Sequence, residues 1–378
     1  MDDEKPLKGP HILLIADYGS VGGTRTYFKQ LLALYAERAA RVTVLRTFED
    51  EEIDALCKLY GNVCVSVRSI VGNRDIFHGK FPSRFLLERR IFKKFIKDVK
   101  ADVVVVSVGT PELFLGAISW VKSSIYILHT YPIITNNVIK RTLKKLFFWI
   151  FISKSKIITV SEFSKNRILC AWGRGAKSID VVYNTAGALP VDIRVPQSDA
   201  INILTVGHVE FYKNPENWID AAIYLKKFKP DLLLKFTWVG DGTELDSCRA
   251  KVSALNAESF IRFVGRDDDV KKYYEDCDIY TQPSLIESLG ISVLDAMRYG
   301  KPSIVAKRGG LPELISEGEN GVLVDPEDIQ DMAHKMQTLA EDSELRKTMG
   351  KRALQLYEER FAEDLWTKKI WQHHSKIL

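Results

Sequence analysis

The chain has 378 residues, of which 46% are hydrophobic and 27% charged, with 23 glycines and 13 prolines. This is ordinary globular composition at a length that usually divides into two domains, so it excludes disordered, collagen-like and disulfide-scaffold proteins. The net charge of +5 is unevenly placed. The residues before Pro190 hold 29 Lys and Arg against 17 Asp and Glu, and the rest hold 25 against 32, a division into +12 and −7 that suggests an anionic partner for the first half.

The sequence carries no evident targeting or membrane-spanning segment. Its longest unbroken apolar run is LFFWIFI (146–152), whereas a spanning helix needs roughly 20 apolar residues. The start MDDEKPLKGP is charged and has no apolar stretch behind it that suits a signal peptide. Five cysteines, without a CxxC pair or histidines at zinc-binding spacing, favour reduced thiols. We therefore expect a cytoplasmic protein.

The first half begins as a strand, a glycine-rich loop and a helix. An apolar run at 11–16 precedes a turn through Gly19, Gly22 and Gly23, and apolar side chains then recur at helical spacing over 26–38. Continuous apolar runs mark strands that are buried on both faces, so we expect a largely parallel sheet covered by helices. Further strands of this kind are predicted at 42–45, 63–67, 103–108, 125–128, 157–160 and 180–183.

The same pattern restarts after a stretch without periodicity, residues 187–200, which is the predicted linker. Strands are predicted at 201–207, 232–240, 261–265, 279–282, 303–306 and 321–324, and the tail is helical. The expected fold class is α/β, with two Rossmann-like doubly wound domains that face one another across a cleft. These domains are residues 1–186 and 201–360, with an amphipathic C-terminal helix, 361–378, that packs back on the first domain.

The loop that begins at Pro283 is the densest candidate site, because ligands of doubly wound sheets bind at the carboxyl ends of strands. A helix is predicted from Ile291 to Tyr299, directly after Gly290. Its first backbone N–H groups would be unpaired and would favour an anion such as diphosphate. Glu287, ahead of the helix, would then lie near whatever that anion carries.

Three other polar residues are candidates, each with an ordinary alternative. Asp295 could accept hydrogen bonds from a ribose diol, or it could be a solvated helix residue. Lys213 follows the strand at 201–207 and could bind phosphate, although most loop lysines are simply solvated. His129 follows another buried strand, where a histidine is a structural group at least as often as a catalytic one.

Several spaced motifs together resemble the family 4 retaining glycosyltransferases, which have the GT-B fold. In the second half they are VGHVEFYKNPENWIDA (206–221), VGDG (239–242), FVG (263–265), PSLIESLGISVLDAM (283–297), RGGLPELI (308–315) and GENGVLV (318–324). The similarity extends more loosely to the first half through Gly22 and Gly23, His129, TVSEFSKN (159–166) and VVYNT (181–185).

The resemblance implies a role for each candidate. Glu287 would contact the donor sugar and Lys213 would neutralise the diphosphate, with His129 beneath the sugar; Glu287 and His129 are the catalytic candidates. The remaining donor-binding candidates are Gly22, Gly23, Gly207, His208, Gly290, Ile291, Ser292 and Asp295.

The chain departs from the family pattern at two of these positions. His208 stands where the family commonly has Arg, and Asp295 stands where its paired acidic motif usually ends in Glu. Because histidine is a cation only when protonated, diphosphate binding should be weaker or should be helped by another cation such as Arg25. The shorter Asp295 leaves the identity of the nucleoside open.

The leaving nucleoside diphosphate carries negative charge, so catalysis should need cations and helix dipoles more than a strong base. The sequence has no DxD-type acidic pair at a strand end. We therefore expect no metal and no other cofactor, with the nucleotide sugar as a substrate. No residue stands out as a covalent nucleophile, and a glycosyl-enzyme on Glu287 is disfavoured.

Basic residues of the first half gather in two segments. Residues 84–100 hold seven basic and two acidic residues, and residues 122–167 hold nine basic and one acidic. The second segment surrounds the apolar run 146–152, and such interleaving suits a helix on anionic lipid. The alternative is a core helix or strand whose flanking lysines are solvated. Nucleic acid is the poorer partner, because no nucleic-acid-binding module is present and the second half is acidic.

These features predict a retaining glycosyltransferase of the hexosyltransferase type. It would move a sugar from a nucleotide-diphosphate donor to a glycan or lipid-linked acceptor in surface polysaccharide or glycolipid biosynthesis, with the inner face of the membrane as a candidate peripheral contact. Two alternatives stay open: a nucleotide-sugar epimerase on the same fold, and a catalytically inactive nucleotide-sugar-binding subunit.

Overall fold

A computed structural model describes residues 9–17, 22–46, 50–66, 83–109, 114–134, 136–153, 155–173, 178–189 and 199–375. The predictions for Gly19, for Val67 and for residues 190–198 of the linker lie outside these ranges. Within the ranges, the side chains of Cys64 and Arg84 are not described. The chain divides into two compact units. One unit contains residues 1–183 and 367–378, and the other contains residues 184–366.

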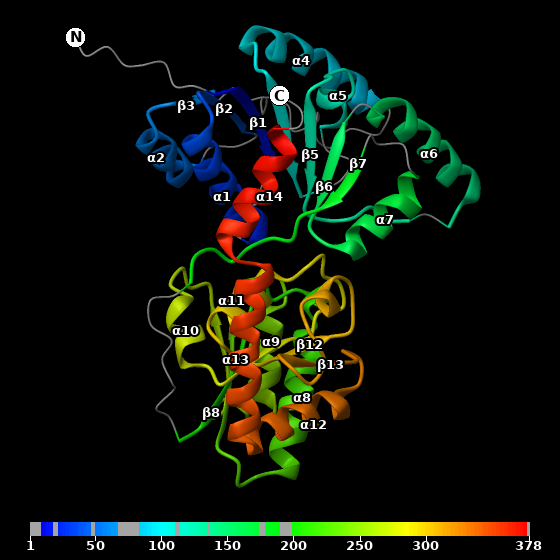
Figure 1. Cartoon of the computed structure of the whole chain (residues 1–378). Coiled ribbons are helices and arrows are strands. Elements are labelled where there is room, and N and C mark those ends of the chain that lie inside the picture. Colours follow the sequence, from blue (N-terminus) through cyan, green and yellow to red (C-terminus); the bar gives the residue numbers. More distant parts are fainter. Residues whose placement is uncertain are drawn as a thin grey trace, which may run out of the picture. The chain divides into compact units, whose positions relative to one another are not determined.

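The first unit is built on a parallel sheet of seven strands in the order β3-β2-β1-β4-β5-β6-β7 (Figure 1). Every pair of neighbouring strands is parallel. β4 and β5 are buried along their whole length, as their continuous apolar sequences require. The strands are β1 (His11–Asp17), β2 (Arg41–Arg46), β3 (Val63–Ser66), β4 (Val103–Val108), β5 (Ser124–Leu128), β6 (Lys156–Thr159) and β7 (Ser178–Val181).

Apolar side chains of the helices form the core of this unit with the sheet. Phe92 stands edge-on to Phe114 with ring centroids 5.4 Å apart, and Phe148 stacks on Trp172 at 3.9 Å. Among the described helices, none has the length and apolarity that crossing a bilayer requires. The helices are α1 (Gly23–Arg38), α2 (Glu51–Leu59), α4 (Ser83–Val99), α5 (Leu115–Ile118), α6 (Val138–Ile152) and α7 (Glu162–Trp172).

The last helix, α14 (Glu363–Ser375), ends against α1 of the first unit. The buried His374 ring lies with its Nε2 2.5 Å from the Tyr35 hydroxyl and its Nδ1 2.7 Å from the Ile370 carbonyl. Burial lowers the pKa of His374 to about 4, so the ring is neutral at physiological pH. A guanidinium from α1, that of Arg38, lies over the Trp371 ring at 5.9 Å. These contacts hold residues 367–375 on the first unit.

The second unit is built on six parallel strands in the order β10-β9-β8-β11-β12-β13. Its core contains Trp218, which stands edge-on to Trp238 at 5.3 Å, and Phe263, which stacks on Trp238 at 5.8 Å. The strands are β8 (Ile201–Val206), β9 (Leu234–Val239), β10 (Ile261–Gly265), β11 (Ile279–Gln282), β12 (Ser303–Ala306) and β13 (Gly321–Val324).

The helices of the second unit alternate with these strands, as a doubly wound fold requires. They are α8 (Pro215–Phe228), α9 (Leu245–Ala254), α10 (Lys271–Asp276), α11 (Ile291–Arg298), α12 (Ile329–Glu341) and α13 (Ser343–Arg360), with two short 3₁₀ turns, η2 (Phe211–Lys213) and η3 (Leu311–Glu313). Of the cysteines whose side chains are described, Cys57, Cys170, Cys248 and Cys277, all are free thiols.

The segment that leads into the second unit is fixed to α13 by one side chain. The Tyr357 hydroxyl lies 3.0 Å from Thr185 Oγ1, accepts a hydrogen bond from the Ala186 N–H at 3.2 Å and donates to the Gly187 carbonyl at 2.5 Å. Arg298 of α11 donates to the Ala188 carbonyl at 2.8 Å. Residues 184–189 are therefore part of the second unit, as their contacts place them.

Candidate active site

The strands of the second sheet are added in one direction up to β10 and in the other direction from β11 on. From β8 the chain moves outward to β9 and β10, and it then returns to place β11 on the other side of β8. In open parallel sheets such a switch point leaves a crevice at the carboxyl ends of the two central strands, and ligands bind there. The loops after β8 and β11 are the two that hold most of the candidate residues from the sequence.

Backbone hydrogen bonds tie three strand-end loops together at this edge. The Leu285 N–H, after β11, donates to the Tyr212 carbonyl, after β8, at 2.8 Å. The Gly310 N–H, after β12, donates to the Glu287 carbonyl at 3.0 Å. Gly309 has φ +62°, and a Cβ there would lie 2.0 Å from the backbone carbonyl oxygen of Glu287. Only glycine allows the third loop to come this close to the second.

Lys213 and Glu287 meet at this junction. The Lys213 Nζ lies 2.5 Å from Glu287 Oε2, and the two side chains are only 13% and 16% exposed. The other Glu287 oxygen accepts from the Ser288 N–H at 3.2 Å. A lysine ammonium has three donors, so Lys213 can hold the carboxylate and an anionic ligand at once. The structure thus brings together two residues that the sequence places 74 positions apart.

The N-terminus of α11 opens beside this pair. Gly290 caps the helix with φ +103°, and its carbonyl accepts from the N–H groups of Val293 and Leu294 at 3.1 and 3.3 Å. The N–H groups of Ile291 and Ser292 precede these first bonds, so they have no intrahelical acceptor and carry the positive end of the helix dipole. This is the arrangement that the sequence predicts for an anion.

A buried polar network fixes the first turn of α11. The Gln282 side chain accepts hydrogen bonds from the hydroxyls of Tyr280 at 2.6 Å and Ser292 at 2.9 Å, and donates to Ser284 Oγ at 2.7 Å. The Tyr274 hydroxyl also donates to the Ser292 carbonyl at 3.2 Å. Sequence reasoning missed Gln282, although a polar residue that ends a buried strand was a usable signal.

Asp295 is not a solvated surface residue. Its side chain is 21% exposed, and its Oδ1 lies 2.8 Å from an Arg298 nitrogen. Burial raises the pKa of Asp295 to about 6, against the opposing effect of the Arg298 charge. Since Arg298 also donates to the Ala188 carbonyl, this ion pair connects α11 to the segment that enters the unit. The carboxylate keeps lone pairs for a further donor.

Gly207 and His208 directly follow β8. The Gly207 N–H donates to the Val239 carbonyl at 3.0 Å, and its own carbonyl accepts from the Trp238 indole at 2.9 Å. His208 is half-buried. The neighbouring Glu210 carboxylate bonds instead to Thr243, through the backbone N–H at 2.9 Å and the hydroxyl at 2.7 Å.

His129 lies at the carboxyl end of β5 in the first unit. Its Nε2 is 2.9 Å from the Ser107 hydroxyl of β4, and its ring stands edge-on to Tyr27 of α1 at 4.4 Å. Nδ1 is buried and meets no hydrogen-bond partner among the residues that the structure describes. Burial lowers the pKa of His129 to about 3, so the ring is a neutral donor or acceptor. One ring nitrogen is held by Ser107, and the other is buried without a partner among the described residues.

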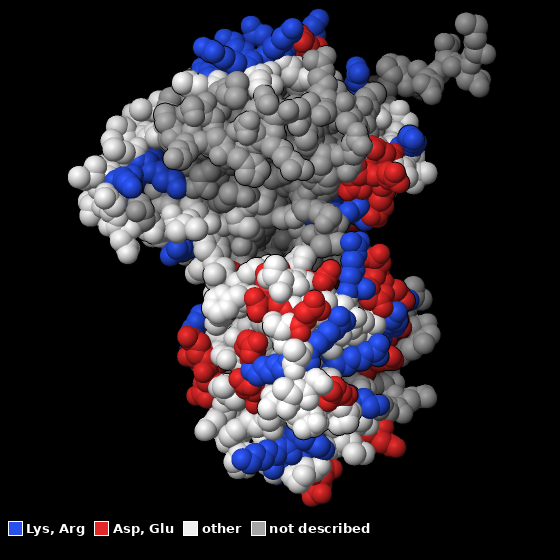
Figure 2. Space-filling view, turned by 180° about the vertical axis from the view of Figure 1, so that it is seen from behind, with Lys and Arg blue, Asp and Glu red and all other residues white. Residues whose placement is uncertain are grey.

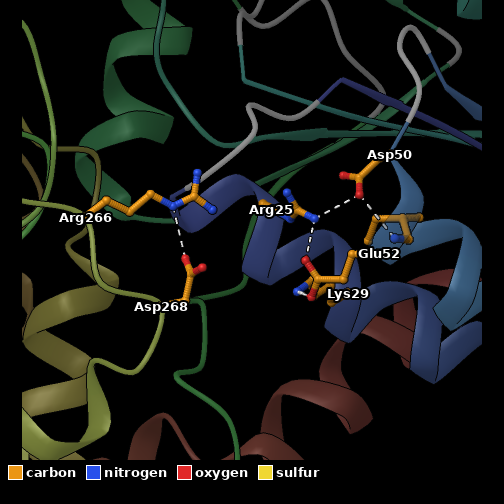
Figure 3. Close-up of polar contacts among 7 residues, drawn as sticks. Arg25, Lys29, Asp50, Glu52, Arg266 and Asp268 are labelled. Atoms are coloured by element: carbon orange, nitrogen blue, oxygen red, sulfur yellow. Dashed lines mark hydrogen bonds and ion pairs between the residues drawn. The ribbon is translucent and has the colours of Figure 1, made fainter.

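Gly22 and Gly23 begin α1, where Gly22 has φ +102°. Arg25, in the first turn, pairs with two carboxylates of the α2 region, Asp50 at 2.9 Å and Glu52 at 2.6 Å (Figure 3). Lys29 pairs with Glu52 as well. The structure therefore balances the charge of Arg25 within the first unit, which weakens the expectation that Arg25 supplements His208.

Among the described residues, no group of three or more His, Cys, Asp and Glu side chains is arranged to hold a metal ion. Positive charge at the second unit's candidate site comes from Lys213 and from the α11 N-terminus. The arrangement can bind a phosphate-bearing ligand whose polar end reaches Glu287 and whose other end reaches Asp295.

Two family models match the chain and together span most of it. The model described as "Glycosyl transferases group 1" matches residues 193–356, and the model described as "Glycosyltransferase Family 4" matches residues 21–186. An uncharacterized glycosyltransferase of Haemophilus influenzae is 29% identical over 335 residues, which cover 83% of this chain and 90% of that protein.

Solved structures of glycosyltransferases have the same fold. A glycosyltransferase of Rickettsia africae is 18% identical with a TM-score of 0.79, over 98% of this chain and 99% of that one. The Anabaena protein HepE, in complex with UDP and glucose, is 21% identical with a TM-score of 0.74, over 97% of this chain and 100% of that one. The two-sheet architecture predicted from the sequence is thereby confirmed as GT-B.

Proposed function

The chain belongs to the family 4 glycosyltransferases of the GT-B fold, and from this premise we propose that it moves a sugar from a nucleotide-diphosphate donor to its acceptor with retention of anomeric configuration. The transferase activity rests on family membership. The retaining course is a proposal that rests on the family, and the donor class and the residue roles are proposals that rest on the geometry of the site.

The observation that carries the proposal is the Lys213–Glu287 pair beside the open N-terminus of α11. A departing diphosphate gains negative charge as the glycosidic bond breaks, and preorganised cations and N–H groups stabilise that charge. Lys213 and the N–H groups of Ile291 and Ser292 supply both kinds of donor from adjacent loops. A structure of the same fold holds UDP and glucose, which supports a nucleotide-sugar donor.

Glu287 in this proposal orients the sugar. Its Oε2 is held by Lys213 and its Oε1 by the Ser288 N–H, so the carboxylate is fixed and its negative charge is partly compensated. A compensated carboxylate is a weak nucleophile but a good acceptor for sugar hydroxyls. We therefore propose that retention proceeds without a glycosyl-enzyme on Glu287.

His129 in this proposal contacts the sugar from the first unit as a neutral ring. Its pKa of about 3 makes it a poor proton donor for the reaction at neutral pH. A neutral imidazole with one ring nitrogen fixed by Ser107 can instead hydrogen-bond a sugar hydroxyl through the other. The cations described above would serve the leaving group, so the proposed reaction needs no metal.

We further propose that the acceptor is a glycan or a lipid-linked molecule in the assembly of a surface polysaccharide or glycolipid, on the cytoplasmic side of the membrane. The support is the basic character of the first unit. In Figure 2, Lys and Arg gather over α4 at the top of the view, whereas acidic and basic side chains alternate over the second unit. Exposed basic residues of α4 and its end are Arg90, Lys93, Lys94, Lys97 and Lys100.

One assay separates the proposed activity from its alternatives. Purified protein is incubated with nucleotide sugars, with and without an acceptor extract, and both nucleoside diphosphate and the sugar configuration are measured. A transferase releases nucleoside diphosphate in an acceptor-dependent way, an epimerase changes the sugar without acceptor, and an inactive binding subunit does neither.

The variant Glu287→Gln tests the role assigned to the site. We expect it to lower the release rate by about 100-fold, as the loss of a fixed polar contact in an active site commonly does. The matched control is Glu341→Gln, which removes a carboxylate from an exposed ion pair with Lys229 and should leave the rate unchanged. Equal rates for the wild type and Glu287→Gln would overturn the proposed role.

A further inference from the structure

α6 of the first unit has two apolar faces. Asn137 caps the helix by accepting a hydrogen bond from the Lys140 N–H at 2.9 Å. One face carries Phe148 and Ile152, which are 3% and 2% exposed and pack on the sheet and on Trp172. This face packs α6 on the core. The opposite face of a surface helix is usually polar, so a polar outer face is expected here.

The outward face is apolar instead. Five large side chains recur along it at intervals of three and four residues, and the structure leaves more than half of each exposed. Scattered exposed apolar residues are normal, but a continuous stripe along about three helical turns marks an interaction surface. The outer face of α6 consists of Ile139 (72% exposed), Leu143 (61%), Leu146 (52%), Trp149 (60%) and Ile150 (51%).

Only positive charge accompanies this stripe. Lys140, Arg141, Lys144 and Lys145 lie on the same helix, and no Asp or Glu occurs anywhere between positions 113 and 161 of the sequence. α4, with its exposed lysines, shares one apolar cluster with α5 and α6 and therefore covers the same face of the sheet. A binding partner that complements this surface would be apolar at its centre and anionic around it.

We propose that the outer face of α6 inserts into the headgroup region of an anionic lipid bilayer. An apolar stripe with flanking lysines and a tryptophan is the composition of helices that lie in the plane of a membrane interface. A protein partner fits less well, because lysines are depleted from protein interfaces whereas they bind anionic headgroups. The bilayer is thus the one occupant that satisfies both parts of the surface.

The position of α6 along the chain connects this surface to the proposed reaction. The helix begins nine residues after His129, and Tyr131 in the intervening loop is held by the Phe163 ring at 4.9 Å and by the Arg167 guanidinium at 5.5 Å. A short loop therefore joins α6 to the residue that we assign to the sugar. This placement rests on the proposed function and favours a lipid-linked acceptor.

Vesicle co-sedimentation tests the surface without any donor or acceptor. The full chain is mixed with vesicles of phosphatidylcholine alone or with 30% phosphatidylglycerol, at about 0.05 M and 0.5 M salt. We expect binding to the anionic vesicles and at least tenfold weaker binding to the neutral ones. Lys140→Gln should weaken binding about fivefold, since each basic residue near the surface contributes about 1 kcal/mol.

The double variant Leu143→Glu/Trp149→Glu is expected to lose vesicle binding by more than tenfold. Its matched control is Leu59→Glu/Leu233→Glu, because these two leucines are 79% and 59% exposed on other parts of the chain. All four side chains are at the surface, so both variants should fold, and circular dichroism verifies this. Equal binding by the two double variants would overturn the proposal.

Tryptophan fluorescence reports the insertion itself. Trp149 is 60% exposed and is the one tryptophan of the seven whose side chain is largely open to water. Anionic vesicles should shift the emission to shorter wavelength, and Trp149→Phe should abolish the shift while it retains vesicle binding. No shift in the wild type would contradict insertion of this face.

Two further results distinguish this proposal from the proposed donor site and from dimer formation through α6. Lys213→Ala should abolish sugar transfer and leave vesicle binding intact, so a failure of the proposed donor site would not appear as a failure at α6. If the wild type ignores vesicles but forms a dimer that Leu143→Glu/Trp149→Glu dissociates, the outer face of α6 contacts a second copy of the chain and the bilayer proposal is refuted.

Discussion

Asp295→Asn should change how stability depends on pH. Burial raises the pKa of Asp295 from 3.8 to about 6 in the folded chain. A raised carboxyl pKa means that the folded state takes up the proton more readily than the unfolded state, so protonation stabilises the fold as the pH falls through 6. Between pH 7.5 and pH 5 this gain is about 1.4 kcal/mol for the wild type, and the asparagine variant lacks it.

The measurement is the free energy of unfolding by urea for both proteins at the two pH values. Other titrating groups are common to both, so the difference of differences isolates Asp295. Arg298 is the charged side chain in contact with Asp295, and the nearby hydroxyls of Tyr274, Tyr280 and Tyr299 have pKa values raised above 10 and stay neutral over this range. A difference near zero would refute the argument that burial outweighs Arg298.

The ionisation of Asp295 should also affect donor binding. Acid pH should weaken the affinity for the donor, whereas it stabilises the fold. If ribose hydroxyls donate to Asp295, the ligand prefers the ionised carboxylate, and the affinity should fall about tenfold from pH 7.5 to pH 5. The ligand should be an intact nucleotide sugar, because a free terminal phosphate titrates near pH 6 itself. Calorimetry on wild type and Asp295→Asn isolates this effect, because the other titrating groups are common to both proteins.

Three other substitutions test parts of the account. Gly290→Ala should destabilise the second unit by about 1–3 kcal/mol in urea unfolding, because φ is +103° and the new Cβ would lie 2.8 Å from Leu311 Cδ2; Gly318→Ala, at φ +79° with nothing within 4 Å of its Cβ, measures the cost of φ alone. His129→Ala should lower the transfer rate about tenfold through the loss of one hydrogen bond, and the rate should show no titration of His129 above pH 5 because its pKa is about 3. Tyr357→Phe removes the hydroxyl that contacts residues 185–187 and leaves the buried Ala186 N–H unpaired, so the free energy of unfolding should fall by about 1–3 kcal/mol; an unchanged value would show that water replaces the hydroxyl.

Most of the fold was predictable because its strands are buried on both faces. Each predicted strand, such as 103–108 or 279–282, coincides with or overlaps an observed one, since a continuous apolar run bounded by turns has few other uses in a chain of this composition. Helix starts such as that of α11 were also accessible, because Gly290 marks the position in sequence. The order of the strands was predictable only through the doubly wound fold class.

The sequence identified the residues of the candidate site, but it did not show most of the contacts that these residues make. The sequence places Lys213 and Glu287 at two strand ends, yet their direct ion pair depends on the Leu285–Tyr212 and Gly310–Glu287 backbone bonds. Arg298 lies three residues after Asp295 on the same helix, so this ion pair was within reach of the sequence but was missed. Asp50 and Glu52, the partners of Arg25, lie on a different element and were out of reach. Such pairings follow from packing, which a local pattern does not encode.

For the apolar run 146–152 the structure supports the core alternative in part, and the contact with lipid stays a prediction. The apolar run 146–152 does enter the core, through Phe148 and Ile152. The same helix also presents Leu146, Trp149 and Ile150 to water. A run that is apolar all round has no periodicity from which its buried side could be identified.

The most direct test of the account is ligand-induced thermal stabilisation in the wild type, in Lys213→Ala and in Lys229→Ala. The last removes a lysine from an exposed ion pair with Glu341, away from the candidate site. UDP, GDP, dTDP and CMP, with their sugars, are each supplied at up to about 100 times a micromolar Kd, which adds about 2.7 kcal/mol and raises the Tm by about 5–10 °C. We expect one nucleotide class to stabilise the wild type and Lys229→Ala, and we expect Lys213→Ala to lose the shift. An equal shift in all three proteins, or none with any nucleotide, would contradict a donor site at Lys213.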